Sequence, residues 1–430
     1  MKTKSFKLNL IAAGLQVGAV LLSTSATAAG FYLHEHSANG LGRAFAGQAA
    51  LAENATVLYS NAAAITEFDK AQLSAFASYI DPGIDIDGTV TVGTAAGTVT
   101  HDASHDDVSP SAVVPAFFYV QPLNDKWSAG LGVFANFGLS TDFDSDFNAL
   151  HFGDRAEITS LGINPTIAYQ VSDELSLGLG VTASFVEAEL GSAVSNVISD
   201  AVGGLVPAGA QIAQMEGDDW GYSWNVGVLW KPTSSTNIGL SYRSETKLEV
   251  SGDLSSQVIA SANQSGTVDL DLPAIAELAI SQQITDALSI QASANWFGWS
   301  SFDVLEADLA DGTIFPIAEE HFENNWKLSL GATYELSDAW TVRAGYAYDE
   351  GAATTEHRTL NIPDTDRQWF SAGATYTMDE STTIDFSLLK VYGREVGLSE
   401  SRAVGPISSE LNATQSSNAT ILSAQVNYSF

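Results

Sequence analysis

Three basic residues, Arg243, Lys327 and Arg343, occupy polar positions in segments where apolar and polar residues alternate. A guanidinium or ammonium group held inside a protein pairs well with a carboxylate, because charge-assisted hydrogen bonds are short and strong. These residues are therefore candidates for binding the head group of an anionic ligand. For each of them the alternative is an ion pair with an acidic residue of the same interior.

The segment HDASHDD at residues 101–107 combines two histidines with three aspartates. Such side chains can bind a divalent cation, but an exposed acidic loop explains the same composition, and we predict no metal site. The chain contains no G-x-S-x-G, H-E-x-x-H, phosphate-loop or dinucleotide-binding motif. We therefore predict neither enzymatic activity nor a cofactor.

The elements that must position the basic residues are predicted to be β-strands with one apolar face. In residues 422–430 every even position is apolar and every odd position is small or polar. Successive side chains of a strand point to opposite faces, and about nine residues suffice for a tilted strand to cross a bilayer. Tryptophan or tyrosine ends several such apolar faces, as in the aromatic girdles of membrane barrels.

Segments of this kind recur along the chain. The predicted strands are 71–80, 112–121, 126–140, 156–170, 174–190, 217–231, 236–250, 266–282, 286–299, 325–336, 339–349, 366–378, 381–392 and 417–430. Apolar outer faces on so many strands require lipid outside, and a membrane forbids an open sheet edge. We predict an all-β fold, in which residues 70–430 form a membrane-spanning antiparallel β-barrel of about 14 strands.

The N-terminus has the features of a secretory signal. Lys2, Lys4 and Lys7 precede an apolar stretch at residues 8–22, and Ala-Thr-Ala at 26–28 matches a small-x-small cleavage site. We predict a signal peptide over residues 1–28. A retained membrane anchor is the alternative, but the apolar run is short for a spanning helix.

The overall charge is strongly acidic. The chain has 51 acidic and 17 basic residues, a formal net charge of −34, and no cysteine. This charge excludes nucleic acid as a partner. The exported protein must be held together without disulfide bonds, by an extensive hydrogen-bonded framework.

Residues 29–69 do not alternate, and we predict that they form a hatch, or plug, inside the barrel lumen. The segment is rich in Gly, Ala and Asn, with a helix-like piece near 44–53. Side chains alone do not fill the lumen of a barrel of about fourteen strands. The apolar residues of this segment, including Phe31, Leu41 and Phe45, are expected to pack there. A flexible leader is the alternative.

Two prolines and a glycine predict a weak place in the barrel wall. Pro115 and Pro165 lie mid-way along the second and fourth predicted strands, and proline donates no hydrogen bond to a ladder. The strand between them contains Asn136, Phe137 and Gly138, and a glycine inside a strand often marks a kink or bulge. We predict a lateral opening here, with a local adjustment of strand twist as the alternative.

One long loop, residues 191–215, has helical periodicity. Its apolar residues recur at intervals of three and four, as in Val194, Val197, Ile198, Val202 and Leu205. We predict that an amphipathic helix over 191–206 captures an apolar ligand outside the membrane. Residues near 314–322, which include Ile314 and Phe315, are predicted to contribute to this binding site. A helix that only caps the barrel mouth is the alternative.

Along its mature length the chain resembles the FadL/TodX-type outer-membrane transporters of long-chain fatty acids and hydrocarbons. The stretches that carry the resemblance are AGFYLHEHSANGLGRAFAG at 29–47, YIDPGIDIDG at 79–88, NFGLSTDF at 136–143, WGYSWNVGVLW at 220–230, YRSETKLEVSG at 242–252 and NIPDTDRQWFSAGATY at 361–376. The resemblance implies a fourteen-stranded barrel, an N-terminal hatch, and a kink in the third strand that opens a lateral passage. It also implies the transport function.

Two departures from the family pattern stand out. The family's hatch usually carries Asn-Pro-Ala, whereas this chain has Asn61, Ala62 and Ala63, and loss of the proline frees φ at the turn. In the family, basic lumenal residues near the ligand suit a carboxylate. The stretch FVEAEL at 185–190 instead contains Glu187 and Glu189 and no base, which leaves uncharged hydrocarbons open.

The sequence thus predicts a passive outer-membrane transporter for hydrophobic molecules, foremost long-chain fatty acids. The cargo would bind in a hatch-gated pocket, to which each buried CH₂ contributes about 0.8 kcal/mol, and would leave laterally near the third strand. A transporter of uncharged aromatic or aliphatic hydrocarbons and a porin for polar solutes are the alternatives. The expected setting is the outer membrane of a Gram-negative bacterium, where a monomer contacts its ligand and outer-membrane lipid.

Overall fold

The computed structural model describes residues 30–95, 97–404 and 407–430. The signal peptide predicted for residues 1–28 lies outside the described residues. Within the described part of the chain, no helix has both the length and the apolar character of a membrane span.

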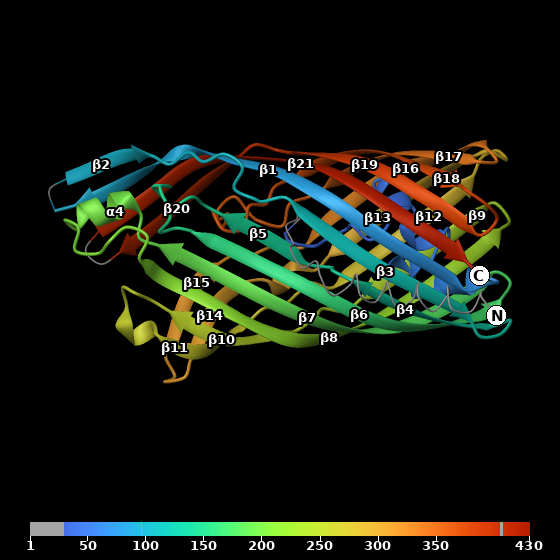
Figure 1. Cartoon of the computed structure of the whole chain (residues 1–430), viewed down its shortest axis with the longest axis horizontal. Helices are drawn as coiled ribbons and strands as arrows, with labels where there is room; N and C mark the ends of the chain where they lie inside the picture. Colours follow the sequence, from blue (N-terminus) through green and yellow to red (C-terminus); the bar gives the residue numbers. More distant parts are fainter. Residues whose placement is uncertain (1–29, 96, 405–406) are drawn as a thin grey trace, which may run out of the picture.

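The described strands form one antiparallel sheet that closes into a barrel of 14 strands (Figure 1). The uninterrupted strands are β1 (Gln72–Thr94), β6 (Arg155–Ser172), β7 (Leu175–Ala193), β8 (Gln211–Thr233), β17 (Trp340–Asp349), β18 (Arg367–Thr377) and β21 (Ile407–Ser429). β1 pairs with β21 from Gln72 opposite Ser429 to Gly93 opposite Ser408, and this pairing closes the barrel.

The other strands each consist of two segments separated by a break. They are β2 (Gly97–Asp102) with β3 (Ala112–Pro122), β4 (Trp127–Phe134) with β5 (Gly138–Asp142), β9 (Thr236–Arg243) with β10 (Glu249–Ser255), β11 (Gln264–Asp269) with β12 (Ile275–Gln283), β13 (Leu288–Phe297) with β14 (Val304–Leu309), β15 (Ile314–Glu319) with β16 (Asn325–Ser337), and β19 (Thr382–Gly393) with β20 (Val396–Val404). The predicted strand number is therefore confirmed.

The first and last strands are much longer than predicted. β1 continues past residue 80 to Thr94, and β21 begins at Ile407 rather than at 417. Beyond Tyr79, outward positions of β1 carry Asp81, Asp85 and Asp87 instead of apolar residues. The predicted ends of these strands were wrong because they were set where the apolar outer face stops. That face stops where the strand leaves the lipid, whereas the strand itself continues.

The two faces of the wall exchange their polarity at the outer membrane surface. On β7, Leu179 points outward and is 49% exposed, and Phe185 packs against Trp220 with ring centroids 5.3 Å apart, as part of an aromatic girdle. Above Phe185 the same outward face carries Glu187 and Glu189, while inward-facing Val186 is fully buried. Glu187 and Glu189 thus project from the outer surface, so their charges do not argue against a carboxylate ligand in the lumen.

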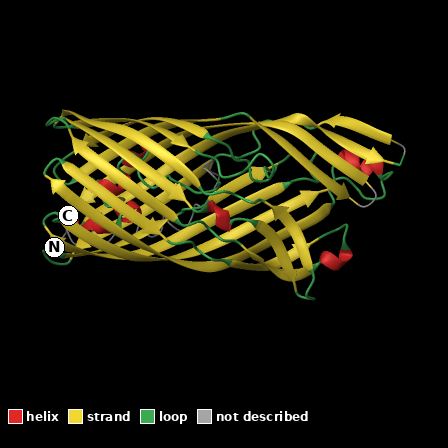
Figure 2. Cartoon of the chain, turned by 180° about the vertical axis from the view of Figure 1, so that it is seen from behind, coloured by secondary structure: helices red, strands yellow, loops and turns green. Residues whose placement is uncertain are grey.

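Residues 30–69, here called the hatch segment, lie inside the barrel (Figure 2). They contain short helices only: α2 (Ala38–Leu41), η1 (Gln48–Ala50), α3 (Val57–Ser60) and η2 (Ala62–Glu67). The predicted helix near 44–53 is not formed, because Ala44 and Phe45 have φ angles of 51° and 62°, which are left-handed. Outside the hatch segment the helices are α4 (Asn196–Ala201), η3 (Ala260–Ala262) and η4 (Trp299–Ser301).

Glycines of the wall allow the hatch backbone to approach the strands. A Cβ atom on Gly345 of β17 would lie 2.1 Å from the carbonyl carbon of Arg43, and one on Gly239 of β9 would lie 2.0 Å from the carbonyl oxygen of Ala49. Both distances are far below van der Waals contact. The hatch segment is therefore fitted to wall positions where only glycine leaves enough room.

Replacing Gly345 by valine tests this fit. We expect Gly345→Val to push the hatch segment off β17 and to lower the free energy of unfolding by about 1–3 kcal/mol, with faster amide exchange in residues 38–50. The matched control is Gly397→Val on β20, where a Cβ would meet nothing within 4 Å. Equal effects of the two substitutions on stability and exchange would contradict the close fit.

Candidate ligand-binding site

An apolar cavity lies in the upper lumen, with about 540 Å³ of space between atoms. We call it the apolar cavity. Strands that continue above the membrane supply most of its lining, which includes Ile158, Met215, Val250, Leu270, Leu305 and Ile317. Glu189 is the single charged residue in the lining, and its side chain is on the outward face of β7, where it forms a salt bridge with Arg155. Such a site suits the hydrocarbon part of a ligand.

The N-terminal part of the hatch segment packs beside this cavity. The ring of Phe31 lies 4.8 Å from that of Trp299 and 5.1 Å from that of Phe302, measured between centroids, with T-shaped geometry. Phe302 lines the apolar cavity. A displacement of the hatch would therefore change the shape of the cavity.

A second cavity, with about 660 Å³ of space between atoms, lies between the hatch segment and the wall. We call it the polar cavity. Its lining includes Tyr32, His34, Tyr59, Arg243, Glu277 and Lys327. One packed cluster of buried residues supplies lining to both cavities: Tyr32 and Ile275 to the polar cavity, and Phe302 and Leu270 to the apolar cavity.

Lys327 is a fully buried cation in this cavity. Its Nζ donates a hydrogen bond to Nδ1 of His34 at 2.9 Å and lies 4.5 Å from the ring centroid of Trp369. Among the described residues, it forms no salt bridge with a carboxylate. The nearby carboxyl groups of Asp349, Glu277 and Glu35 act on this ammonium group from beyond salt-bridge distance. A buried ammonium group without a direct carboxylate partner favours binding of an anion.

Arg243 shares the polar cavity and also has no salt bridge within the described ranges. One guanidinium nitrogen donates to Oγ1 of Thr182 at 2.6 Å, and another donates to the carbonyl oxygen of Tyr59 at 3.3 Å. The guanidinium carbon lies 4.7 Å from the ring centroid of Tyr59. Arg243 and Lys327 are thus brought to one cavity, as a head-group site requires.

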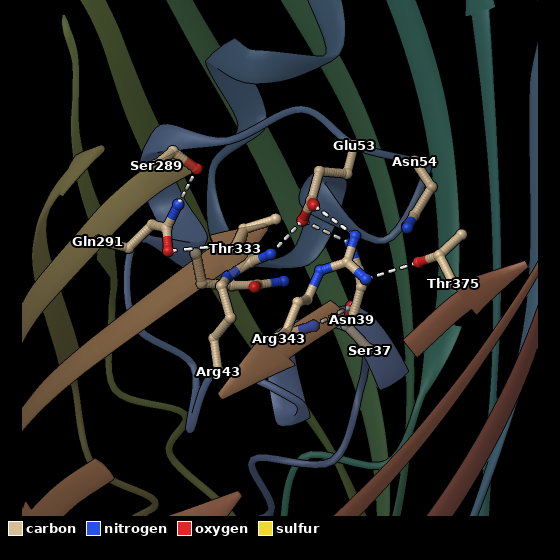
Figure 3. A network of polar contacts seen from close by, with 12 residues as sticks. Ser37, Asn39, Arg43, Glu53, Asn54, Ser289, Gln291, Thr333, Arg343 and Thr375 are labelled. Atoms are coloured by element: carbon tan, nitrogen blue, oxygen red, sulfur yellow. Dashed lines mark hydrogen bonds and ion pairs between the residues drawn. The ribbon is translucent and has the colours of Figure 1, made fainter. Parts of the chain in front are cut away.

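Arg343 has a different role. Figure 3 shows it beside Glu53 of the hatch segment, to which it donates a hydrogen bond of 2.8 Å, and Arg43 donates to the other oxygen of Glu53 at 2.6 Å. Arg343 also donates to Oγ1 of Thr375 at 2.5 Å. This network ties the hatch segment to β17 and β18. For Arg343 the alternative reading therefore holds, namely an ion pair within the lumen.

The third barrel strand is interrupted at residues 135–137, between β4 and β5. The ladder between β3 and β4 ends at Phe117 opposite Val133, and within the described residues β5 pairs with β6 alone. The interrupted strand instead contacts the hatch segment. Tyr32 pairs with Phe137, the N–H of Leu33 donates to the carbonyl of Asn136 at 3.0 Å, and the N–H of Gly138 donates to the carbonyl of Phe31 at 2.9 Å.

The two prolines act on different ladders. Pro115 lies just past the end of the β3–β4 ladder, beside the interruption. Pro165 remains paired with Leu131 of β4. The pairs that are missing at residues 164 and 165 are those with β7. There the side-chain amide of Asn164 donates a hydrogen bond to the backbone carbonyl of Val181 at 2.9 Å. The expectation that both prolines weaken the third strand was therefore wrong for Pro165.

The turn without proline in the hatch is held by a side chain. The side-chain Nδ2 of Asn61 donates hydrogen bonds to the backbone carbonyls of Ala49 at 2.6 Å and Val228 at 3.0 Å. The side-chain Oδ1 of Asn61 accepts one from the backbone N–H of Ala63 at 3.0 Å. Ala62 and Ala63 lie against Gly178 of β7. The side chains of Phe31, Leu41 and Phe45 are buried.

The predicted outer capture groove is not formed. Val194, Val197 and Ile198 are buried in an extracellular cluster with Phe147 and Ile86. Helix α4 is six residues long, and the chain after it forms a loop that leads into β8.

The other predicted groove residues lie apart. Val202 packs against the edge of the extracellular cluster, Leu205 is 86% exposed, and Ile314 is exposed on β15. Phe315 packs against the lumenal cluster instead. The helical periodicity corresponds to the short helix α4, whose apolar side chains pack in the extracellular cluster.

Sequence reasoning missed the lining of the apolar cavity. Val250 and Met215 are inward residues of strand segments above the membrane, and Leu270 directly follows β11. The sequence does contain a signal for these residues: apolar and polar positions still alternate above the membrane, but there the apolar positions face inward. It could be interpreted only with knowledge of where each strand leaves the lipid.

A loop over residues 350–366, here called the side loop, is anchored above the outer girdle by two carboxyl groups, the buried Glu320 and the half-buried Glu400. Oγ1 of Thr359 donates to Glu320 at 3.2 Å, and the N–H of Leu360 donates to Oε1 of Glu400 at 2.7 Å. Burial and, to a smaller extent, the neighbouring Glu400 raise the pKa of Glu320 to about 8. Burial also raises the pKa of Glu400 to about 7.

These shifts predict a pH dependence of the side loop. Because both folded-state pKa values lie above the ordinary value of 4.5, the stability from these groups is full below pH 4.5 and is lost as pH rises through 7 and 8. We expect amide exchange of residues 350–366, corrected for intrinsic rates, to increase from pH 6 to pH 9. Glu320→Gln should remove most of the increase, whereas Glu356→Gln, an exposed control, should not. A wild-type increase that persists in Glu320→Gln would contradict this.

Comparison with known proteins agrees with this architecture. The sequence model of the family described as "Outer membrane protein transport protein (OMPP1/FadL/TodX)" matches residues 19–430. The chain is 32% identical to the long-chain fatty acid transport protein of Escherichia coli O6:H1, over 97% of this chain and 98% of that protein. It is 33% identical to outer membrane protein P1 of Haemophilus influenzae, over 99% of this chain and 100% of that protein.

Solved structures share the fold. The crystal structure of a FadL homologue from Pseudomonas aeruginosa superposes with a TM-score of 0.83 at 24% identity, covering 94% of this chain and 100% of the other. The toluene transporter TodX of Pseudomonas putida gives a TM-score of 0.66 at 17% identity, covering 95% and 99%. The chain therefore belongs to the OMPP1/FadL/TodX family, and it is a transporter of the bacterial outer membrane rather than an enzyme.

Proposed function

We propose that this protein takes up long-chain fatty acids passively across the outer membrane. The observation that carries the proposal is Lys327, a fully buried lysine without a salt bridge among the described residues, in a cavity that also holds Arg243. The similarity to a long-chain fatty acid transport protein supports the same cargo. A barrel that closes on itself through β1 and β21 needs no second copy, and we expect a monomer.

The two cavities match the two parts of a fatty acid. The acyl chain occupies the apolar cavity, where each buried CH₂ contributes about 0.8 kcal/mol. The carboxylate enters the polar cavity and compensates the charges of Lys327 and Arg243. Because an unpaired buried charge is costly, this pairing favours an anionic head group over an uncharged one.

Release requires the hatch segment to move. Residues 31–33 contact both the aromatic wall of the apolar cavity and the interrupted third strand. When these contacts break, the apolar cavity changes shape. The unpaired stretch of wall between β3 and β5 is then no longer covered from the lumen by residues 31–33. The cargo then leaves sideways at residues 136–138, without a water-filled channel.

The second candidate function is transport of uncharged hydrocarbons. The observation in its favour is the lining of the apolar cavity, which contains no basic residue. A porin for polar solutes is disfavoured, because the hatch segment occupies the lumen and is tied to the wall through Glu53.

Substitution of Lys327 separates the two cargo classes. For Lys327→Met we expect the dissociation constant of oleate to rise about 10- to 100-fold, the equivalent of one charge-assisted hydrogen bond, and that of 1-octadecene to stay unchanged. Binding is measured on purified protein in detergent, with Lys126→Met, an exposed lysine, as the control. Unchanged oleate binding would remove Lys327 from the head-group site, and an equal loss for both ligands would favour uncharged cargo.

A disulfide bond tests the lateral exit. Tyr32 and Phe137 pair in a non-hydrogen-bonded antiparallel position, where Cα atoms lie about 4.5 Å apart, and the chain has no other cysteine. Tyr32→Cys combined with Phe137→Cys should abolish oleate uptake by cells when oxidised and restore it on reduction. The single variants, under the same oxidant, are the controls. Full uptake by the oxidised double variant would exclude an exit at this place.

A further inference from the structure

The barrel wall lacks strand pairing at a second place, above the outer girdle. Within the described residues, β15 pairs with β14 alone and β20 pairs with β21 alone. β17, which follows β15 and β16 around the barrel, ends at Asp349, and β18 begins only at Arg367. The side loop (residues 350–366) therefore forms the wall between β15 and β20.

The side loop is thin where it separates the outside from the lumen. An outer hollow, with about 1530 Å³ of space between atoms, is lined by residues that include His321, Gly351, Arg394 and Val396. An inner vestibule of about 1800 Å³ is lined by residues that include Phe315 and Arg402. The two spaces share Glu356, His357 and Arg358 of the side loop. These three residues are the partition between them.

The outer hollow opens at the level of the membrane surface. Tyr348, at the outer end of the apolar face of β17, donates a hydrogen bond of 3.0 Å to Oδ2 of Asp366, which lines the hollow. Tyr392 is exposed at the end of β19, and Arg394, two residues further on, lines the hollow as well. A molecule dissolved in the outer leaflet would therefore meet the hollow directly.

The inner vestibule leads to the apolar cavity. Leu190, Met215 and Ile317 line both spaces. A chain that passes the partition therefore reaches the apolar cavity without crossing the extracellular cluster that contains Val194 and Val197. Continuity with the cavity identifies the occupant as an acyl chain.

The charges at the partition determine which end of the cargo enters first. The outer hollow contains Arg358 and Arg394 but also Glu356 and Glu395. Arg358 is buried and donates hydrogen bonds to the carbonyl oxygens of Asp364 and Gly397, each at 3.1 Å. Glu323 and Asp366 line the hollow as well, so its four carboxylates outnumber its two arginines. The hollow therefore does not draw in a carboxylate, and the head group stays at the surface while the tail advances.

We propose that the side loop is a lateral port, through which a single-chain acyl compound moves tail first from the outer leaflet into the inner vestibule. The proposal rests on the proposed function for the identity of the cargo. It differs from the exit at residues 136–138 in position and in direction of movement. The anchors Glu320 and Glu400, on the two sides of the loop, are the contacts that opening must break.

The absence of cysteine from the chain allows a direct test. Glu356→Cys places one thiol on the exposed partition, and Leu205→Cys places one on the exposed tip of the loop after α4. Each variant, in whole cells, is treated with a polyethylene-glycol maleimide that is too large to enter the barrel. Uptake of oleate and of hexadecane is then measured separately, and the untreated variants report the basal rate.

Modification at Glu356→Cys should lower the uptake rate at least about fivefold, and modification at Leu205→Cys should leave it nearly unchanged. A block at Leu205→Cys alone, or no block at either position, would overturn the lateral port. If the untreated protein takes up hexadecane but not oleate, the fatty-acid function fails. The lateral port is then tested by the effect of the maleimide on hexadecane uptake. If it takes up neither cargo, both proposals fall.

Discussion

Hydrogen bonding of the backbone in lipid is the constraint on which the rest of this structure depends. The bilayer interior offers no water to an unpaired N–H or C=O group, so strands that cross it must form a closed ladder. The pairing of β1 with β21 over more than twenty residues provides that closure. Closure also fixes the width of the barrel, and a barrel of 14 strands encloses a lumen that its own side chains cannot fill.

The hatch segment fills this lumen, and its contacts combine tight packing with limited electrostatic attachment. Wall glycines such as Gly345 and Gly239 let backbone meet backbone, while Arg343 and Glu53 form an ion pair between wall and hatch. Ion pairs and hydrogen bonds can be exchanged for contacts with a ligand. Lys327 lacks a salt bridge within the described part of the chain, so the lumen retains an unused attraction for an anion.

The wall is interrupted at two places that differ in what covers them. At residues 135–137 the hatch segment supplies hydrogen bonds where the ladder between neighbouring strands is interrupted. Between β15 and β20 the interruption lies above the lipid, where water can satisfy an exposed edge and a loop suffices as a cover. Each interruption borders a packed apolar interior, which is the physical requirement for moving an acyl chain through a protein wall.

The sequence by itself determined the barrel, the number of its strands and its apolar outer face, because the period of two is a local property of each strand. It also pointed to Asn136, Phe137 and Gly138 as a weak place in the third strand, and the strand is interrupted at residues 135–137. Tertiary structure alone decided which lumenal cations are paired. Arg343 forms an ion pair with Glu53, a hatch residue far away in the chain, whereas Arg243 and Lys327 form no salt bridge among the described residues. It likewise decided that Glu187 and Glu189 face outward and Val250 inward, because the polarity of each face depends on where the strand leaves the lipid, which is set by the girdle of the whole barrel and not by any one segment.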